Sequence, residues 1–273
     1  VDFAALSFVV IDEQHKFGVN QRSMLSAKGI NPDVLIMTAT PIPRTLCLTL
    51  YGDLDVSVIN ELPPGRGKIT SYHFPQEKSA AVYEKVRQWV KEGTQAYIIY
   101  PLVEESEKLD LKAAKESFDH FVAFEFKGLR LALVHGQMDR CEVDEIMQRF
   151  KKHEIDILVA TSILEVGIDV ANANIMVIEH AERFGLSQLH QLRGRIGRSA
   201  KNAMCLLLSD PTTPEGVQRL EAIVKTTDGF KIAEHDLQIR GPGHYFGRHQ
   251  HGLNEIKVAN PITQIDLLQK ARA

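Results

Sequence analysis

Two adjacent carboxylates in the sequence have the chemistry to act on a phosphate. An apolar run from Phe8 ends in Asp12 and Glu13, and His15 follows. Carboxylates that close a buried parallel strand lie at the sheet edge where ligands bind in α/β folds. Asp12 offers the hard oxygen ligands that suit Mg²⁺, and Glu13 is placed to orient or deprotonate an attacking water. The alternative is an ordinary solvated strand end.

A second group consists of three crowded arginines. Arg193, Arg195 and Arg198 share the segment 191–198 with Gln191, two glycines and no acidic residue. Guanidinium is planar, permanently charged and suited to phosphate, and in phosphoryl transfer it stabilises charge on the γ-phosphate. Because crowded like charges repel, we expect all three arginines to face an anion. The stretch 183–201 has five basic residues and no acidic one, which predicts a locally positive surface. A generic basic patch for a nucleic-acid backbone is the alternative.

Small polar residues close several other apolar runs. Thr38 and Thr40 are expected to relay contact between the carboxylates and a nucleic-acid strand. His135 also ends a run; it is a candidate for contact with nucleic acid, and the alternative is an ordinary turn histidine. The alternative for the threonines is a plain strand-to-loop turn.

The segment 160–170 is the last candidate. Thr161 and Ser162 are placed to donate hydrogen bonds to a backbone phosphate. Gly167 and Asp169 are expected to approach a nucleotide ribose closely. The alternative is a strand-to-helix loop with surface carboxylates.

The elements that position these residues alternate between strand and helix patterns, which predicts α/β folding with mostly parallel sheets. The predicted strands are apolar on both faces, as buried parallel strands are; they are Phe8–Asp12, Val34–Thr38, Ile69–Phe74, Ala96–Pro101, Arg130–His135, Ile155–Thr161, Ile175–Ile178 and Met204–Leu208. The predicted helices are Lys78–Lys91, Lys108–Phe126, Arg140–Lys152 and Ser187–Ile196.

Prolines and glycines in 62–68 mark a linker. It predicts three regions: an incomplete α/β lobe at 1–62, a complete lobe at 68–210, and a helical to irregular region at 211–273. The glycines at 241–247 have the wrong spacing for a dinucleotide-binding fingerprint.

Composition limits the class of protein. The 273 residues are 44% hydrophobic and 25% charged, with a net charge of −3, which is typical of a globular protein. The longest apolar stretch is interrupted by charges, so no membrane span is expected. The three cysteines are widely spaced, which disfavours a zinc site and fits a reducing cytosol.

The order of these segments resembles motifs II, III, V and VI of superfamily 2 helicases, namely Asp-Glu-Gln-His, Thr-Ala-Thr, Thr-Ser-Ile-Leu-Glu-Val-Gly-Ile-Asp-Val and Gln-x-x-Gly-Arg-x-Gly-Arg. The longer text Thr-Ala-Thr-Pro-Ile-Pro-Arg (38–44), Glu-Leu-Pro-Pro-Gly-Arg (61–66) and Asp-Leu-Gln-Ile-Arg-Gly-Pro-Gly (236–243) is similar to the RecG family of branch-migrating DNA helicases. The resemblance covers essentially the whole chain.

The resemblance implies a motor that binds ATP and Mg²⁺ between two RecA-like lobes and acts on replication forks and Holliday junctions in the bacterial cytosol. It implies that Asp12 holds Mg²⁺ and that Glu13 is the catalytic carboxylate. It also implies that Arg195 and Arg198 act as arginine fingers supported by Gln191. His15, Thr38 and Thr40 would couple hydrolysis to DNA movement. A translocation motif over 230–252 would use the polar residues Arg240, Arg248 and Gln250.

The sequence also departs from the family. Gly-His-Tyr-Phe-Gly at 243–247 replaces the usual Gly-Glu-Leu-Leu-Gly, and neither a phosphate-binding loop nor a fork-splitting wedge domain occurs in these residues. We therefore expect no ATPase activity from the 273 residues alone. Two rivals are a transcription-repair coupling translocase and a DNA-binding module that has lost its motor. Glu61 to Arg66 and Gln14 favour the RecG family, and retention of Glu13 with both arginine fingers argues against a decayed module.

Overall fold

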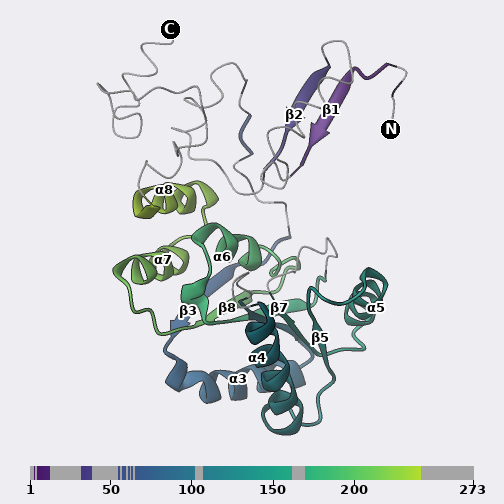
Figure 1. Cartoon of the computed structure of the whole chain (residues 1–273), viewed down its shortest axis with the longest axis vertical. Helices are drawn as coiled ribbons and strands as arrows, with labels where there is room; N and C mark the ends of the chain where they lie inside the picture. The colour runs from purple at the N-terminus through teal and green to yellow at the C-terminus, as the bar shows by residue number, and fades with distance from the viewer. Residues whose placement is uncertain are drawn as a thin grey trace.

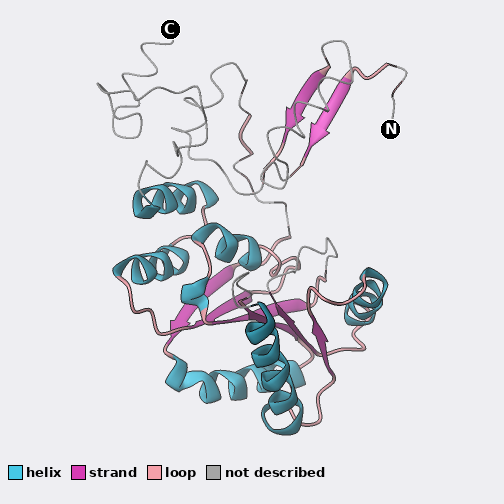
Figure 2. Cartoon of the chain, in the orientation of Figure 1, coloured by secondary structure: helices cyan, strands magenta, loops and turns pink. Residues whose placement is uncertain are grey.

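The computed structural model of the chain describes residues 3, 5–12, 32–38, 55, 57–59, 61, 63, 65–101, 107–161 and 170–240. Within these ranges the strands form a two-stranded sheet and a six-stranded sheet (Figures 1 and 2). Every strand pair in both sheets is parallel. The predicted α/β class with parallel sheets is confirmed.

The six-stranded sheet has the order β3-β8-β7-β4-β6-β5. Its strands are β3 Ile69–Phe74, β4 Gln95–Tyr100, β5 Leu131–Val134, β6 Ile157–Thr161, β7 Ala173–Glu179 and β8 Ala203–Leu208. Every residue of the central strands β4, β6 and β7 is buried, which agrees with the apolar pattern on both faces. Each strand overlaps its predicted range, and β7 extends further in both directions than predicted.

Helices cover both faces of this sheet (Figure 1). They are α3 Ser79–Lys91, α4 Glu107–His120, α5 Arg140–Lys151, α6 Leu186–Arg193, α7 Pro214–Lys225 and α8 Gly229–Arg240. Local sequence starts two of them. Asp139 accepts a hydrogen bond from the backbone of Cys141 in a capping box at α5, and the Thr213 hydroxyl accepts one from Gly216 at α7.

The alternation of side chains along the strands divides the core into two layers. On one face, Tyr97, Leu158 and Met176 pack with apolar residues of α5, α6, α7 and α8. On the other face, Ile98 and Val159 pack with α3 and α4. This two-layer burial fixes the register of each strand, because a shift by one residue would exchange the two faces.

Two predicted helix ends differ from the structure. The predicted helix Ser187–Ile196 ends at Arg193 because glycines follow, and Gly197 takes a left-handed φ of +68°. The helix predicted to run through Phe126 changes at His120 into a π turn, Phe121–Glu125, in which the Phe126 amide donates to the Phe121 carbonyl. The wider turn brings Phe121 and Phe126 onto one face, where both rings contact Tyr83 edge-on.

The two-stranded sheet pairs β1 Phe8–Ile11 with β2 Asp33–Ile36. Here the prediction of burial on both faces is wrong, since Val10 and Leu35 are about half exposed. Only Val9 and Ile11 are buried in this sheet.

No helix within the described ranges is long and apolar enough to cross a membrane.

Candidate functional site

The segment Gly194–Ser199, here called the arginine loop, carries Arg195 and Arg198 at the amino-terminal edge of the six-stranded sheet. It follows α6 directly and leads into β8. The Ser199 hydroxyl donates to the side chain of Asn174 at the start of β7, over 3.2 Å. The Ser199 carbonyl accepts from the amide of Gly67, two residues before β3, over 2.6 Å. The loop is therefore fastened to the amino ends of two strands.

Arg193 does not face an anion, so the expectation that all three arginines do so is wrong for this residue. Its side chain is 2% exposed. It donates to the carbonyls of Ile223 at 2.6 Å and Thr226 at 2.8 Å, at the end of α7, and it is bonded to His190 Nδ1 at 2.9 Å. The last carbonyls of a helix have no partner within it and carry partial negative charge, which suits a buried guanidinium. Sequence reasoning missed this role because the partners are backbone atoms that leave no signature.

The His190 imidazole should make stability pH-dependent. Burial and the charge of Arg193 lower its pKa to about 4, outweighing the opposing effect of Asp228. Since the unfolded value is about 6.5, the unfolded chain binds more protons between these values. The stability that neutral His190 contributes is thus fully present above about pH 6.5 and is lost as pH falls toward 4. For a partly exposed ring we expect a loss of about 1–2 kcal/mol.

Urea unfolding between pH 7.5 and 4.5 measures this loss. The matched control is His190→Asn, which keeps an acceptor for Arg193 but does not titrate. We expect the control to show a flatter pH dependence than the parent chain. Parallel curves for the two proteins would show that His190 is not the source.

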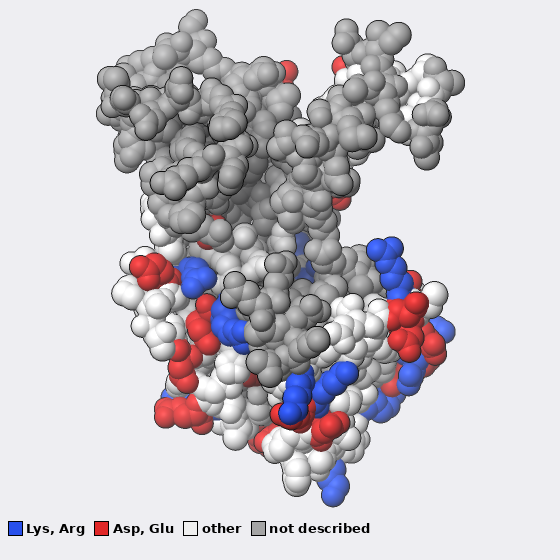
Figure 3. All heavy atoms as spheres, in the orientation of Figure 1, with Lys and Arg blue, Asp and Glu red and all other residues white. Residues whose placement is uncertain are grey.

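Arg195, Arg198 and Gln191 remain candidates for contact with a ligand, since each is partly exposed. Among the described residues, no ion pair joins Arg195 to a carboxylate. The predicted local positive surface is smaller than expected because Arg193 is buried. On the face seen in Figure 3, basic and acidic side chains alternate over the described lobe.

The carboxyl-terminal edge of the same sheet carries His135 and Thr161. Strands β5 and β6 are paired there, with Val134 opposite Ala160, so the two polar residues follow neighbouring strand positions. Thr161 is 1% exposed, and neither its hydroxyl nor the buried Nδ1 of His135 has a hydrogen-bond partner among the described residues. Burial, together with the charge of Lys115, lowers the pKa of His135. A neutral imidazole has an N–H donor and a hydroxyl has an O–H donor, and a phosphate oxygen can accept a hydrogen bond from either.

The two candidate groups therefore lie on opposite edges of one lobe. All six strands run in the same direction, so the arginine loop at the amino edge is separated from His135 and Thr161 by the length of the strands. This arrangement suits a lobe that contacts one ligand at each edge.

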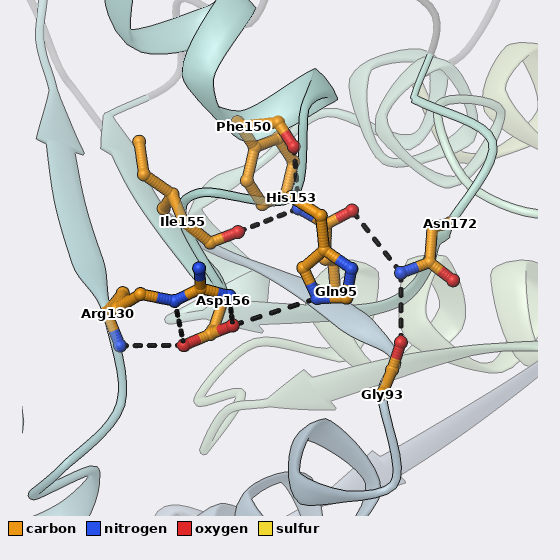
Figure 4. A network of polar contacts seen from close by, with 8 residues as sticks. All are labelled: Gly93, Gln95, Arg130, Phe150, His153, Ile155, Asp156 and Asn172. Atoms are coloured by element: carbon orange, nitrogen blue, oxygen red, sulfur yellow. Dashed lines mark hydrogen bonds and ion pairs between the residues drawn. The ribbon is translucent and has the colours of Figure 1, made fainter.

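A network of polar groups ties together the rest of the amino edge (Figure 4). The Gln95 side chain donates to the carbonyls of Phe150 and Ile155, both at 2.7 Å. Asp156 receives the guanidinium of Arg130 through two hydrogen bonds, of 3.0 and 2.5 Å. Partial burial pushes the pKa of Asp156 upward, but these bonds outweigh it and lower that pKa. The network spans the starts of β4, β5 and β6, and we assign it a structural role.

A buried carboxylate, Glu179, lies at the end of β7. Its oxygens accept from the Tyr83 hydroxyl at 2.6 Å and from the Gln76 amide at 3.1 Å. Burial raises the pKa of Glu179 despite these hydrogen bonds, and burial together with the nearby carboxylate raises the pKa of Tyr83. Because both partners come from the segment around α3, this cluster holds α3 to the sheet.

The remaining candidates lie partly outside the described residues. Asp12 and Thr38 follow paired strands, and both are exposed. The residues whose structure is not described are Glu13, His15, Thr40, Ser162, Gly167, Asp169, Arg248 and Gln250. Arg240 ends α8, but its side chain is not described. Within the part of the chain that the structure describes, no His, Cys, Asp and Glu side chains cluster as metal ligands would.

Two models of known protein families match parts of the chain. The model of the helicase conserved C-terminal domain matches residues 77–200. The model of ATP-dependent DNA helicase RecG, domain 3, C-terminal, matches residues 226–273.

Curated relatives match over the full chain. ATP-dependent DNA helicase RecG of Thermotoga maritima is 50% identical over 272 residues, which is all of this chain and 35% of the relative. The RecG of Bacillus subtilis is 47% identical over 273 residues, which is 40% of its length. The chain thus spans between a third and two fifths of the length of these relatives.

Solved structures agree with this match. A structure of RecG bound to a three-way DNA junction is 45% identical and has a TM-score of 0.72, over 98% of this chain and 34% of that one. The helicase Lhr of Mycobacterium smegmatis, at 16% identity and a TM-score of 0.55, shares the fold over 81% of this chain and 30% of its own. About half of the chain's residues are identical to those of RecG proteins, and this similarity extends over its whole length.

Proposed function

We propose that the RecG-type protein containing this segment is an ATP-dependent DNA helicase that remodels replication forks and Holliday junctions in recombination and repair. The observation that carries the proposal is the 45% identity, over 98% of this chain, to a RecG structure bound to a three-way DNA junction. The separation of the arginine loop from His135 and Thr161 supports it, because a motor must contact nucleotide and DNA at different places. A bacterial cytosol is the proposed location, since the named relatives are bacterial proteins.

The nucleotide side of the motor is assigned to residues from both predicted lobes. Arg195 and Arg198 would contact the γ-phosphate of ATP, and Gln191 on the last turn of α6 would support them. Arginine fits this task because it stays charged and binds phosphate through two donors at once. Glu13 would orient the attacking water.

Magnesium fits the same site. Asp12 is an exposed carboxylate at the carboxyl end of a parallel strand, and its hard oxygens suit Mg²⁺. When bound, the ion would neutralise charge on the phosphates. Gly167 and Asp169 would lie against the ribose of the nucleotide.

The DNA side is assigned to the carboxyl edge of the second lobe and to the region after it. His135, Thr161 and Ser162 would donate hydrogen bonds to backbone phosphates, which position a protein on DNA without reading sequence. His15, Thr38 and Thr40 would couple nucleotide state to that contact.

The translocation region is proposed to begin with α8. Its side chains Ile232 and Leu237 are buried in the described structure, which anchors the region to the second lobe. Arg240, Arg248 and Gln250 would transmit the nucleotide state to the duplex. The proposed regions are therefore 1–62, 68–210 and 211–273.

ATP turnover by the full-length protein tests this function. We expect a three-way junction to stimulate turnover at least about 10-fold more than linear duplex of equal length, because the motor engages DNA productively only at a branch; a tenfold rate difference corresponds to about 1.4 kcal/mol. The 273-residue chain alone is the matched control and should show no stimulated turnover. Equal stimulation by the linear duplex, or turnover by the 273 residues alone, would contradict the proposal.

A further inference from the structure

Arg66, in the segment that joins the two predicted lobes, is bonded to the arginine loop on both sides of Arg195. Its Nη2 donates to the carbonyl of Gly194 over 3.0 Å, and its Nε donates to the carbonyl of Gly197 over 3.3 Å. Arg66 is half-buried. One guanidinium thus spans the turn that presents the first arginine finger.

The backbone after Arg66 follows the same loop. The Gly67 amide donates to the Ser199 carbonyl, and a Cβ atom on Gly67 would lie 1.8 Å from the Lys201 carbonyl oxygen. The contact is therefore too close for any other residue type. Ile69 packs in the same way against Gly197, where an added Cβ would lie 2.7 Å from its Cγ1. The joining segment and the loop form one closely packed unit.

Two glycines make the loop dependent on such support. Gly194 and Gly197 lack side chains that could pack, and glycine backbones have more conformations to lose than others. A guanidinium has donors in a fixed planar arrangement and can therefore bridge two carbonyls at a set separation. Arg66 fits that arrangement, whereas a lysine has a single donor group.

We infer that Arg66 is a positioning residue for ATP hydrolysis: by bridging Gly194 and Gly197, on either side of Arg195, it holds Arg195 where the γ-phosphate is transferred. This inference rests on the proposed function, because it gives Arg66 a task only if Arg195 acts on ATP. Arg66 itself does not contact the nucleotide. It acts through Arg195.

The test uses the full-length protein with junction DNA and compares Arg66→Ala, Arg66→Lys and Arg195→Ala. We expect Arg66→Ala to lower kcat about 10- to 100-fold, because misplacement of a catalytic group by about 1 Å has effects of that size. The KM for ATP and the affinity for ADP should each stay within about twofold of the parent values. The affinity for ADP with aluminium fluoride, which mimics the transition state, should fall as much as kcat does, because only the transition state needs the arginine finger in place. Arg66→Lys should be as impaired as Arg66→Ala.

A double variant separates positioning from general structural damage. If Arg66 acts through Arg195, adding Arg66→Ala to Arg195→Ala lowers kcat no further, whereas independent effects would multiply. Thermal unfolding of each variant checks that the protein is folded. Full activity of Arg66→Ala or Arg66→Lys, or multiplying effects, would overturn the inference. If instead Arg195→Ala has normal turnover, the proposed function of the arginine loop fails, which is a different result from a silent Arg66 variant.

Discussion

Replacing Arg193 with alanine should lower the free energy of unfolding by about 3–5 kcal/mol, the range for removing one partner of a buried charged interaction. The side chain is among the largest that are fully buried. Its removal would leave the carbonyls of Ile223 and Thr226 without their donor, and each unsatisfied buried group costs about 1–3 kcal/mol. It would also leave a cavity between α6 and α7. Chemical unfolding of the parent chain and the variant gives the difference.

The control for this prediction is an arginine of the same lobe that is on the surface. Arg149 is about half exposed and pairs with Glu154 at 3.6 Å, and an exposed pair of this kind contributes about 0–1 kcal/mol. Arg149→Ala should therefore change stability little. A third variant, Arg193→Lys, keeps the charge but has a single donor group for two carbonyls, so its stability should lie between the other two. If Arg193→Ala loses less than Arg149→Ala does, the buried contacts do not stabilise the lobe.

Most of the six-stranded sheet could be predicted from the sequence. The run at 96–101 is short, apolar and bounded by turn residues, and uninterrupted apolar runs of that length are typical of buried parallel strands. The run at 69–74 mixes β-branched and aromatic residues with polar ones, which is also typical of a strand. They form β3 and β4 with at most one residue of difference. Helical patterns alternate with these strands, and this alternation predicts the α/β class, because parallel strands need a crossover connection that is usually a helix.

The order of the strands and the end of α6 were harder to predict from the sequence. The sequence has no marker that places β8 between β3 and β7, because the β3–β8 pairing joins residues far apart in the chain, such as Ile69 and Ala203. The predicted helix Ser187–Ile196 ends three residues later than α6 does, since the apolar Ile196 continues the helical period. The left-handed φ of Gly197 ends that period.

At the candidate site, residue type could be predicted but not residue role. The arginines at 193, 195 and 198 look equivalent in the sequence, yet Arg193 is buried in the core while Arg195 is only half-buried. Helical geometry explains the difference. Arg193 is the last residue of α6 and points with Leu189 toward the interior, whereas the loop begins one residue later. Arg66 was hidden for another reason: its partners are carbonyls about 130 residues away.

Replacing Arg195 with alanine in the full-length protein should lower junction-stimulated ATP turnover by about 10³-fold or more. An arginine that stabilises charge on the transferred phosphoryl group contributes about 10³–10⁵ in kcat. Stability should change little, because the side chain is partly exposed and no ion pair to it occurs among the described residues. Affinity for DNA should also be unchanged, since the proposed DNA contacts His135 and Thr161 lie on the other edge of the sheet. Steady-state turnover, DNA binding and thermal unfolding measure the three quantities.

Lys201→Ala is the matched control, because Lys201 follows the arginine loop in the same basic stretch and is exposed. If the loop acts only as a positive patch that attracts DNA, removing either charge should weaken DNA binding most at low salt, make that binding less dependent on salt, and reduce turnover to a similar degree. If Arg195 acts on the phosphoryl group, Lys201→Ala should keep most of its turnover while Arg195→Ala loses nearly all of it at saturating ATP and DNA. Equal losses in the two variants would assign the loop to DNA attraction and not to catalysis. The position of the loop favours catalysis, since it is fastened to the segment predicted to join the two lobes and lies at the amino edge, away from the strand ends proposed to hold DNA.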